Sequence, residues 1–161
     1  MEGSTLKGSP PKFYEPWDIT DLESAWQMSR GDLLLEGGPW AAELKEDLFV
    51  PLEEGHLRAV TSALTLAEIL VRPKSLGRED VCQEYKALLC SYPNLAIVPF
   101  TVETAVLCAE IRARYRLRTP DAVQLAAALE KGATVFLTND AGLPGEVGGV
   151  RVAVLKDILS L

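Results

Sequence analysis

The sequence predicts a single α/β domain, a three-layer α/β/α sandwich with a mainly parallel sheet. Short runs of apolar and β-branched residues, typical of buried strands, alternate along the chain with longer stretches of helical periodicity. Helices that connect successive strands favour a parallel sheet covered on both faces. The chain has 161 residues, 48% of them hydrophobic and 24% charged, which is enough for one core and does not suggest a second domain.

The N-terminal part of the chain has no clear strand. Residues 1–12 are rich in Gly, Ser and Pro, and we expect a flexible arm ahead of a single domain over residues 13–161. Residues 19–28 have a passable helical pattern. Apolar positions between residues 32 and 53 suggest helical pieces, broken at Gly37, Gly38, Pro39 and Pro51.

From residue 57 onward the elements are easier to recognise. Strands are predicted at 57–62, 95–100, 134–138 and 150–155. Helices are predicted to begin at Thr65, with disruption at Pro73, and to cover 78–89, 101–115 and 120–131. A Gly-rich loop at 142–149 precedes the last strand, so the predicted order is β-α-α-β-α-α-β-β.

The helix at 120–131 begins and ends at clear signals. Thr119 is a plausible N-cap and Pro120 a plausible first helical residue, which places Asp121 in the first turn. Gly132 is a natural stop, and after a two-residue break the strand TVFLT leads to Asp140.

The short link between this helix and this strand brings Asp121 and Asp140 together. It forces the two elements to run antiparallel, and about twelve helical residues at ~1.5 Å each span the length of five or six strand residues at ~3.3 Å each. Both carboxylates should therefore lie at the sheet edge where ligands bind in open α/β folds. Two carboxylates converge favourably only around a cation, and oxygen ligands suit Mg²⁺ or Mn²⁺.

Glu68 is a candidate for a third carboxylate at this edge. It lies near the start of the helix that follows the 57–62 strand, and it reaches the same edge if that strand is parallel to TVFLT. The alternative, of about equal weight, is a capping box in which Glu68 satisfies the amide of Thr65.

Composition excludes several function classes. The net charge of −7 and pI of about 4.8 argue against a protein that coats polyanions generally, although a local basic patch or bound cations could admit nucleic acid. Three cysteines without C-x-x-C spacing argue against a disulfide framework or a zinc site. The sequence has no apolar run of about 20 residues and no signal-peptide pattern, so we expect no membrane association and a cytoplasmic location.

The stretches TSALTLAEILVRP, RTPDAVQLAAALEKGATVFLTND and GVRVAVL together resemble the PIN-domain ribonucleases, above all the toxins of VapBC-type toxin–antitoxin pairs. The resemblance runs from about Leu33 to Leu159. It includes the family's glutamate, the aspartate of its D-A-x-x-L-A-A helix and the aspartate of its T-N-D strand end, which match Glu68, Asp121 and Asp140.

The resemblance implies a metal-dependent endoribonuclease, the toxin component of a toxin–antitoxin pair. In that family four acidic residues bind one or two divalent metals, which activate a water that cleaves an RNA phosphodiester bond. Glu68, Asp121 and Asp140 would take both the catalytic and the metal-binding roles. The partners implied are RNA, an antitoxin protein and a second copy of the chain in a homodimer.

The front of the chain departs from the family pattern. The family has a hydrophobic strand ending in an aspartate, within a motif like L-D-T-N, and no such motif is present. Asp18, Asp21 or Asp32 could replace that ligand in space, but none has the right flanks. The alternative function is therefore a catalytically degenerate PIN-like module that binds a protein partner or RNA, and an unrelated small-molecule domain is disfavoured because no G-x-G-x-x-G or P-loop is present.

Several other residues have two readings. Arg116 and Arg118, in an alternating run with Arg112 and Arg114, could hold RNA phosphates, or could belong to a solvated helix end. Thr138 and Asn139 flank Asp140 and could orient ligands or bind substrate, but Asn-Asp pairs are also common in turns. His56 fits a solvated loop, and we expect the tryptophans to pack or cover a partner surface more often than to stack on bases; they are Trp17, Trp26 and Trp40.

Overall fold

The computed structural model describes residues 48–158 of the chain. Several predictions lie outside that range. They concern the arm at residues 1–12, the helical pattern at 19–28, the substitute ligands Asp18, Asp21 and Asp32, and the tryptophans Trp17, Trp26 and Trp40.

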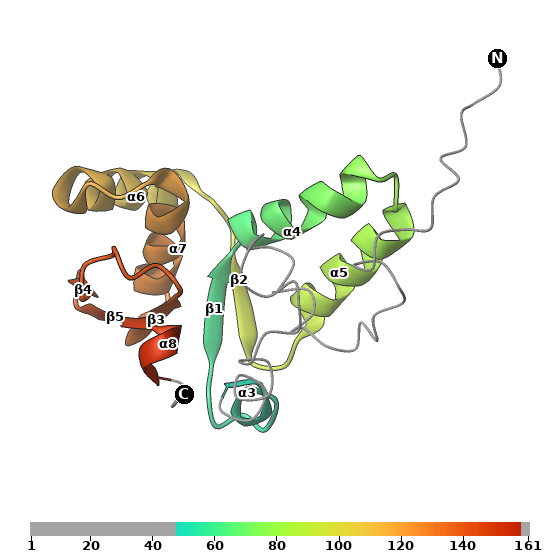
Figure 1. The fold of residues 1–161 in the computed structure, drawn as a ribbon, viewed down its shortest axis with the longest axis horizontal. Coiled ribbons are helices and arrows are strands. Elements are labelled where there is room, and N and C mark those ends of the chain that lie inside the picture. The colour runs from blue at the N-terminus through green and yellow to red at the C-terminus, as the bar shows by residue number, and fades with distance from the viewer. Residues whose placement is uncertain (1–47, 159–161) are drawn as a thin grey trace, which may run out of the picture.

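The first sheet consists of two parallel strands joined by a pair of helices (Figure 1). Ser62 pairs with Val98 at the carboxyl end of the two strands. Both helices of the connection lie on one side of this sheet in Figure 1. The elements are β1 (Ala59–Ser62), α4 (Ala63–Ser75), α5 (Glu79–Ser91) and β2 (Leu95–Val98), preceded by the short α3 (Val50–Glu53).

The second sheet follows a helical hairpin and has the strand order β3-β5-β4. β3 and β5 are parallel, and only the short β4 pairs antiparallel. The hairpin packs closely, with α7 crossing between α6 and the second sheet (Figure 1). The elements are α6 (Val102–Tyr115), α7 (Thr119–Glu130), β3 (Val135–Thr138), β4 (Glu146–Val147), β5 (Val150–Val154) and α8 (Leu155–Ile158).

The predicted mainly parallel α/β class is confirmed, and so is the predicted order of elements from β1 to β3; β4 and the short α8 are additional. The pairing of the strands adds a detail that the sequence pattern did not contain. Within residues 48–158, β1 pairs with β2 alone and β3 with β5 alone, so the strands divide into two sheets. The carboxyl ends of β1 and β3 are therefore not joined by strand pairing in the described part of the chain.

Apolar residues form two cores, one for each sheet. The first contains α5 and α4 residues around Tyr85 and Leu89, each 1% exposed. The second is built on α7, where Ala122, Leu125 and Ala126 are fully buried, as its apolar sequence predicted. Burial of a leucine such as Leu125 contributes roughly 1.5–3 kcal/mol, so this apolar face holds α7 in the second core.

Three local details differ from the sequence prediction. Helix α4 begins at Ala63 with Ser62 as its N-cap, not at Thr65, because the Ser62 side chain accepts the N–H of Leu64 at 3.2 Å. Pro73 lies inside α4 rather than disrupting it, and the helix ends two residues later at Ser75. The short strand β4 forms within the predicted Gly-rich loop.

No helix within residues 48–158 is long and apolar enough to cross a membrane.

Candidate active site

Helix α7 presents Asp121 at its first turn, close to the predicted position. The helix begins at Thr119, one residue earlier than predicted, with Arg118 as N-cap and Pro120 in the first turn. Proline is favoured there because its fixed φ suits a helix start and no N–H partner is needed. The Asp121 side chain is only 13% exposed, so its carboxylate is held in a sheltered position that a helix N-terminus makes favourable for negative charge.

Asp140 is held by the backbone of the turn that follows β3. Its own N–H donates to Thr138 Oγ1 at 3.0 Å, and its Oδ1 accepts the N–H of Gly142 at 2.8 Å. A Cβ at position 142 would lie 3.0 Å from that same Oδ1, so glycine permits the close approach. The Asp140 carboxylate is thus oriented by its own loop: Oδ1 accepts the N–H of Gly142, and Oδ2 faces Arg118.

Arg118 connects the two aspartates. Its Nε lies 3.4 Å from Asp121 Oδ2, and its Nη2 lies 3.5 Å from Asp140 Oδ2. One guanidinium reaches both carboxylates only if they lie close together, so the structure brings Asp121 and Asp140 together as the helix–strand geometry predicted. It also shows that the space between them accommodates a cation.

The role of Glu68 as a third ligand stays a prediction. Glu68 is an exposed residue of α4, and the capping-box alternative is wrong because the N-cap is Ser62, six residues before Glu68. Within residues 48–158 there is no group of three or more His, Cys, Asp or Glu side chains placed to hold one metal ion. The assumption behind Glu68 was a strand parallel to β3 in one sheet, and β1 pairs only with β2 in the described residues.

Gln124 connects α7 to the start of α4, a contact that the sequence did not reveal. Its Oε1 accepts the N–H of Ser62 at 3.0 Å, and its Nε2 donates to Thr65 Oγ1 at 2.7 Å. Thr65 also bonds Thr61 Oγ1 at 2.6 Å. The only signal in the sequence was one polar residue within the otherwise apolar AVQLAAAL, and nothing there named its partners.

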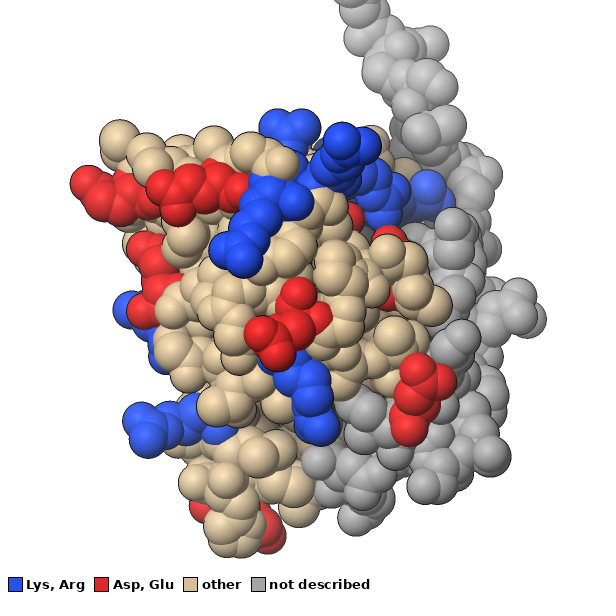
Figure 2. All heavy atoms as spheres, turned by 90° about the vertical axis from the view of Figure 1, so that its left-hand side faces the viewer, with Lys and Arg blue, Asp and Glu red and all other residues tan. Residues whose placement is uncertain are grey.

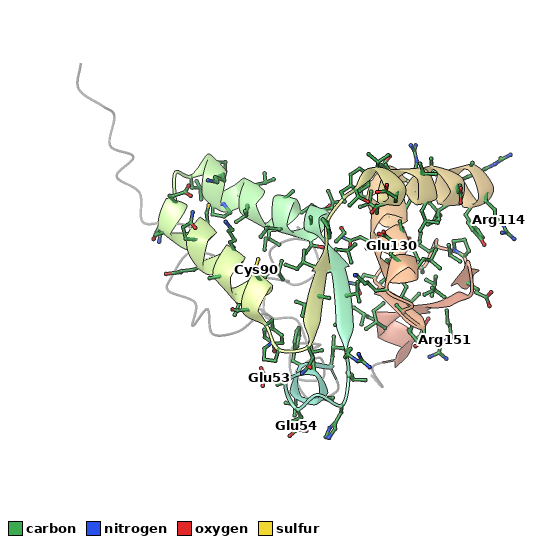
Figure 3. The ribbon with its side chains drawn as sticks, turned by 180° about the vertical axis from the view of Figure 1, so that it is seen from behind. Glu53, Glu54, Cys90, Arg114, Glu130 and Arg151 are labelled. Carbon is green, nitrogen blue, oxygen red and sulfur yellow. The ribbon has the colours of Figure 1, made fainter. Side chains whose placement is uncertain are left out.

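The arginines near the site divide between structural and exposed roles. Arg112 Nε donates to the carbonyl of Leu117 at 3.3 Å, and Arg114 lies 5.4 Å from the centre of the Tyr115 ring. Arg114 projects from the outer end of α6 (Figure 3). Arg116, in the left-handed conformation at the helix end, is exposed, as is Arg118.

The charge around this end of the molecule is mixed. Figure 2 shows lysine and arginine side chains gathered along the upper part of this face, with acidic side chains beside them at its corner. Basic side chains therefore gather locally on this face despite the net charge of −7. It is local rather than a continuous band across the face.

The residues beside Asp140 and the single histidine have distinct environments. Thr138 is 1% exposed and accepts the N–H of Asp140, so the structure favours its orienting role over direct contact with a substrate. Asn139 is partly exposed at the end of β3. His56 is exposed in a turn, 3.3 Å from Glu54 Oε2, in agreement with the solvated-loop prediction.

The chain is similar to known proteins in both sequence and fold. The family model described as PIN domain matches residues 37–145. A solved structure described as a toxin–antitoxin complex from Klebsiella pneumoniae has a similar fold, with a TM-score of 0.54 and 23% identity over 76% of this chain and 88% of that chain. No curated protein matches the chain.

Proposed function

Because the chain belongs to the PIN domain family, we propose that it is a metal-dependent endoribonuclease acting as the toxin of a toxin–antitoxin pair. Proteins of this family are generally divalent-metal-dependent nucleases. The observation that carries the proposal is the convergence of Asp121 and Asp140 on one cationic group, at 3.4 and 3.5 Å. Asp121 is 13% and Asp140 40% exposed, and two carboxylates that share one cation in this way are the arrangement from which a metal site is built.

The donor atoms of this pair fit Mg²⁺ or Mn²⁺. Both ions prefer oxygen ligands, and Asp140 Oδ2 and Asp121 Oδ2 already face one cation. We propose that these two carboxylates hold the ion and that Glu68 is a further ligand, directly or through water. When bound, such an ion supplies an activated water and neutralises charge on the phosphate and the leaving oxygen.

The other residues of the site act on position and on the substrate. Thr138 and Gly142 orient the Asp140 carboxylate through the hydrogen bonds given above, so it need not reorganise when the ion binds. Arg118 lies exposed beside the carboxylates, and Arg116 is exposed two residues before it. We propose both for RNA phosphates, which guanidinium groups bind in bidentate fashion. Asn139 lies at the same strand end and is proposed as a further substrate contact.

The proposed partners follow from the structural neighbour and from exposed apolar side chains. The similar solved structure is described as a toxin–antitoxin complex, which supports an antitoxin as partner. Phe100, Val102 and Val106 are 52%, 76% and 56% exposed around the start of α6. Apolar side chains this exposed are typical of surfaces that a partner covers, and we propose an antitoxin or a second copy of the chain there.

An RNA cleavage assay with matched variants tests the proposal. The full chain is incubated with RNA in Mn²⁺ or Mg²⁺, with and without EDTA. Asp121→Asn should reduce cleavage by about a hundredfold or more, because one ligand to the ion is lost. Asp80→Asn is the control, since Asp80 also lies in the first turn of a helix beside an N-cap arginine, and it should leave cleavage unchanged.

The same assay also tests a second candidate, a catalytically silent module that binds RNA or protein. This candidate is favoured by the finding that only two acids converge within residues 48–158. RNA binding without cleavage in either metal, unaffected by Asp121→Asn, would support the silent module. Cleavage that continues in EDTA and in Asp121→Asn would contradict the metal mechanism itself.

A further inference from the structure

The guanidinium of Arg118 lies where a metal ion shared by Asp121 and Asp140 would bind. It contacts Oδ2 of both residues, and the second oxygen of Asp140 is engaged by the N–H of Gly142. Asp140 therefore has one carboxylate oxygen available for a cation, and Arg118 is beside it. Arginine and metal cannot both hold this oxygen at close range, because two cations would then share one small space.

The ion pairs of Arg118 are looser than those of a comparable arginine elsewhere in the fold. Arg78 is the N-cap of α5 and donates hydrogen bonds to the Asp80 carboxylate, with nitrogen–oxygen distances of 2.7, 2.9 and 3.2 Å. These hydrogen bonds lower the pKa of Asp80 to about 2. Arg118 is the N-cap of α7 and bridges two carboxylates at 3.4 and 3.5 Å, so each contact is weaker and more easily exchanged.

The side chain of Arg118 can also move away from the two carboxylates. It is 78% exposed, and it makes no side-chain cap to α7, so its departure would not disturb the helix start. A guanidinium that swings out by rotation of its own side chain remains at the rim of the site. At the rim it is well placed for a phosphate oxygen.

We propose that Arg118 is an internal counter-cation of Asp121 and Asp140, which a divalent metal displaces and which then binds the RNA phosphate. This inference rests on the proposed function and adds a regulatory role for one residue. Arg118 neutralises the two carboxylates while no metal is present, and it sets the metal concentration at which the site fills. Metal loading and phosphate binding are then coupled, because the same event fills the site and releases the arginine.

The first experiment measures metal affinity without using activity. Mn²⁺ alone is titrated into the full chain, and free Mn²⁺ is read by electron paramagnetic resonance. Arg118→Gln should bind Mn²⁺ about threefold to tenfold more tightly than the wild type, since exposed ion pairs contribute modestly and two of them are removed. Arg78→Gln removes a matched N-cap arginine, and Arg114→Gln removes a charge from the neighbouring helix; both should leave the affinity unchanged.

The second experiment measures RNA binding in Ca²⁺, chosen to fill the site without supporting cleavage. Arg118→Gln should weaken RNA binding several-fold although it strengthens metal binding. A purely structural role for Arg118 would move both affinities in the same direction. These opposite shifts therefore separate the two explanations.

The outcomes keep the inference separate from the proposed function. If Asp121→Asn abolishes Mn²⁺ binding while Arg118→Gln leaves it unchanged or weaker, the metal site stands and the counter-cation role is overturned. If Mn²⁺ binds equally well to the wild type and to Asp121→Asn, the proposed site itself fails. Mn²⁺ binding detected only in Arg118→Gln would support the inference, and binding in neither protein would overturn it.

Discussion

Removal of the Gln124 side-chain amide should destabilise the fold strongly, because this amide joins α7 to the start of α4. The amide bonds Ser62 N–H at 3.0 Å and Thr65 Oγ1 at 2.7 Å, and these partners are 1% and 4% exposed. In Gln124→Met the volume is retained but both bonds are lost. The buried Ser62 N–H is left without its acceptor at a cost of about 1–3 kcal/mol, and the lost bond to Thr65 adds about 1 kcal/mol.

The expected loss for Gln124→Met is therefore about 2–4 kcal/mol, a large part of the 5–15 kcal/mol typical of a domain. Urea unfolding followed by circular dichroism measures it. With a slope of about 2 kcal/mol per molar urea, the unfolding midpoint should fall by roughly 1–2 M.

Gln83→Met is the matched control for this change. Gln83 also lies in a helix and donates to a side chain, Glu79 Oε1 at 2.9 Å, but it is exposed. Its substitution should change the free energy of unfolding by less than about 0.5 kcal/mol. Equal losses for the two variants would refute the claim that Gln124 is a buried link between α7 and α4.

Two further predictions concern Asp140 and the pair formed by Arg78 and Asp80. Gly142→Ala places a Cβ 3.0 Å from Asp140 Oδ1 and should displace that carboxylate, which lowers kcat/KM for RNA cleavage about tenfold with little change in stability. Gly145→Ala is the control, because its Cβ meets no atom within 4 Å, and equal activities of the two variants would contradict the steric argument. The pKa of Asp80 is lowered to about 2, from 3.8, by the hydrogen bond from Arg78, so this pair stabilises the fold above pH 4 and its contribution is lost as the pH falls from about 4 to 2. An NMR titration should give the low midpoint in the wild type and a normal midpoint in Arg78→Gln; a normal midpoint in both would show that the pair does not form in solution.

The predicted elements came from signals that are local in the chain. The apolar helix at Thr119–Glu130, its stop at Gly132 and the strand that follows were each readable from fewer than twenty residues. The convergence of Asp121 and Asp140 then followed from the short link, because it forces the helix and the strand to run antiparallel. That part of the site could be derived without tertiary information.

Contacts between distant parts of the chain could not be derived in the same way. Gln124 and Ser62 are 62 residues apart, and no periodicity shows which polar group will bond which. The placement of Glu68 depended on whether β1 and β3 share one sheet, which is a question of strand pairing across the fold. Arg118 was expected to hold phosphates, and its contact with both carboxylates emerged only when the two elements were placed in space.

The link through Gln124 also bears on the distance between Glu68 and Asp121. Glu68 lies three residues after Thr65 on α4, and Asp121 lies three residues before Gln124 on α7, so each acid is about one turn, or ~4.5 Å along its helix axis, from the Thr65–Gln124 contact. The two acids approach each other only if the helices run in opposite directions where they touch; otherwise the same hydrogen bond holds them apart. Gln124 also accepts the N–H of Ser62, so the start of α4 is held to α7 at more than one point. The position of Glu68 relative to Asp121 therefore follows from the directions in which these two helices leave the contact.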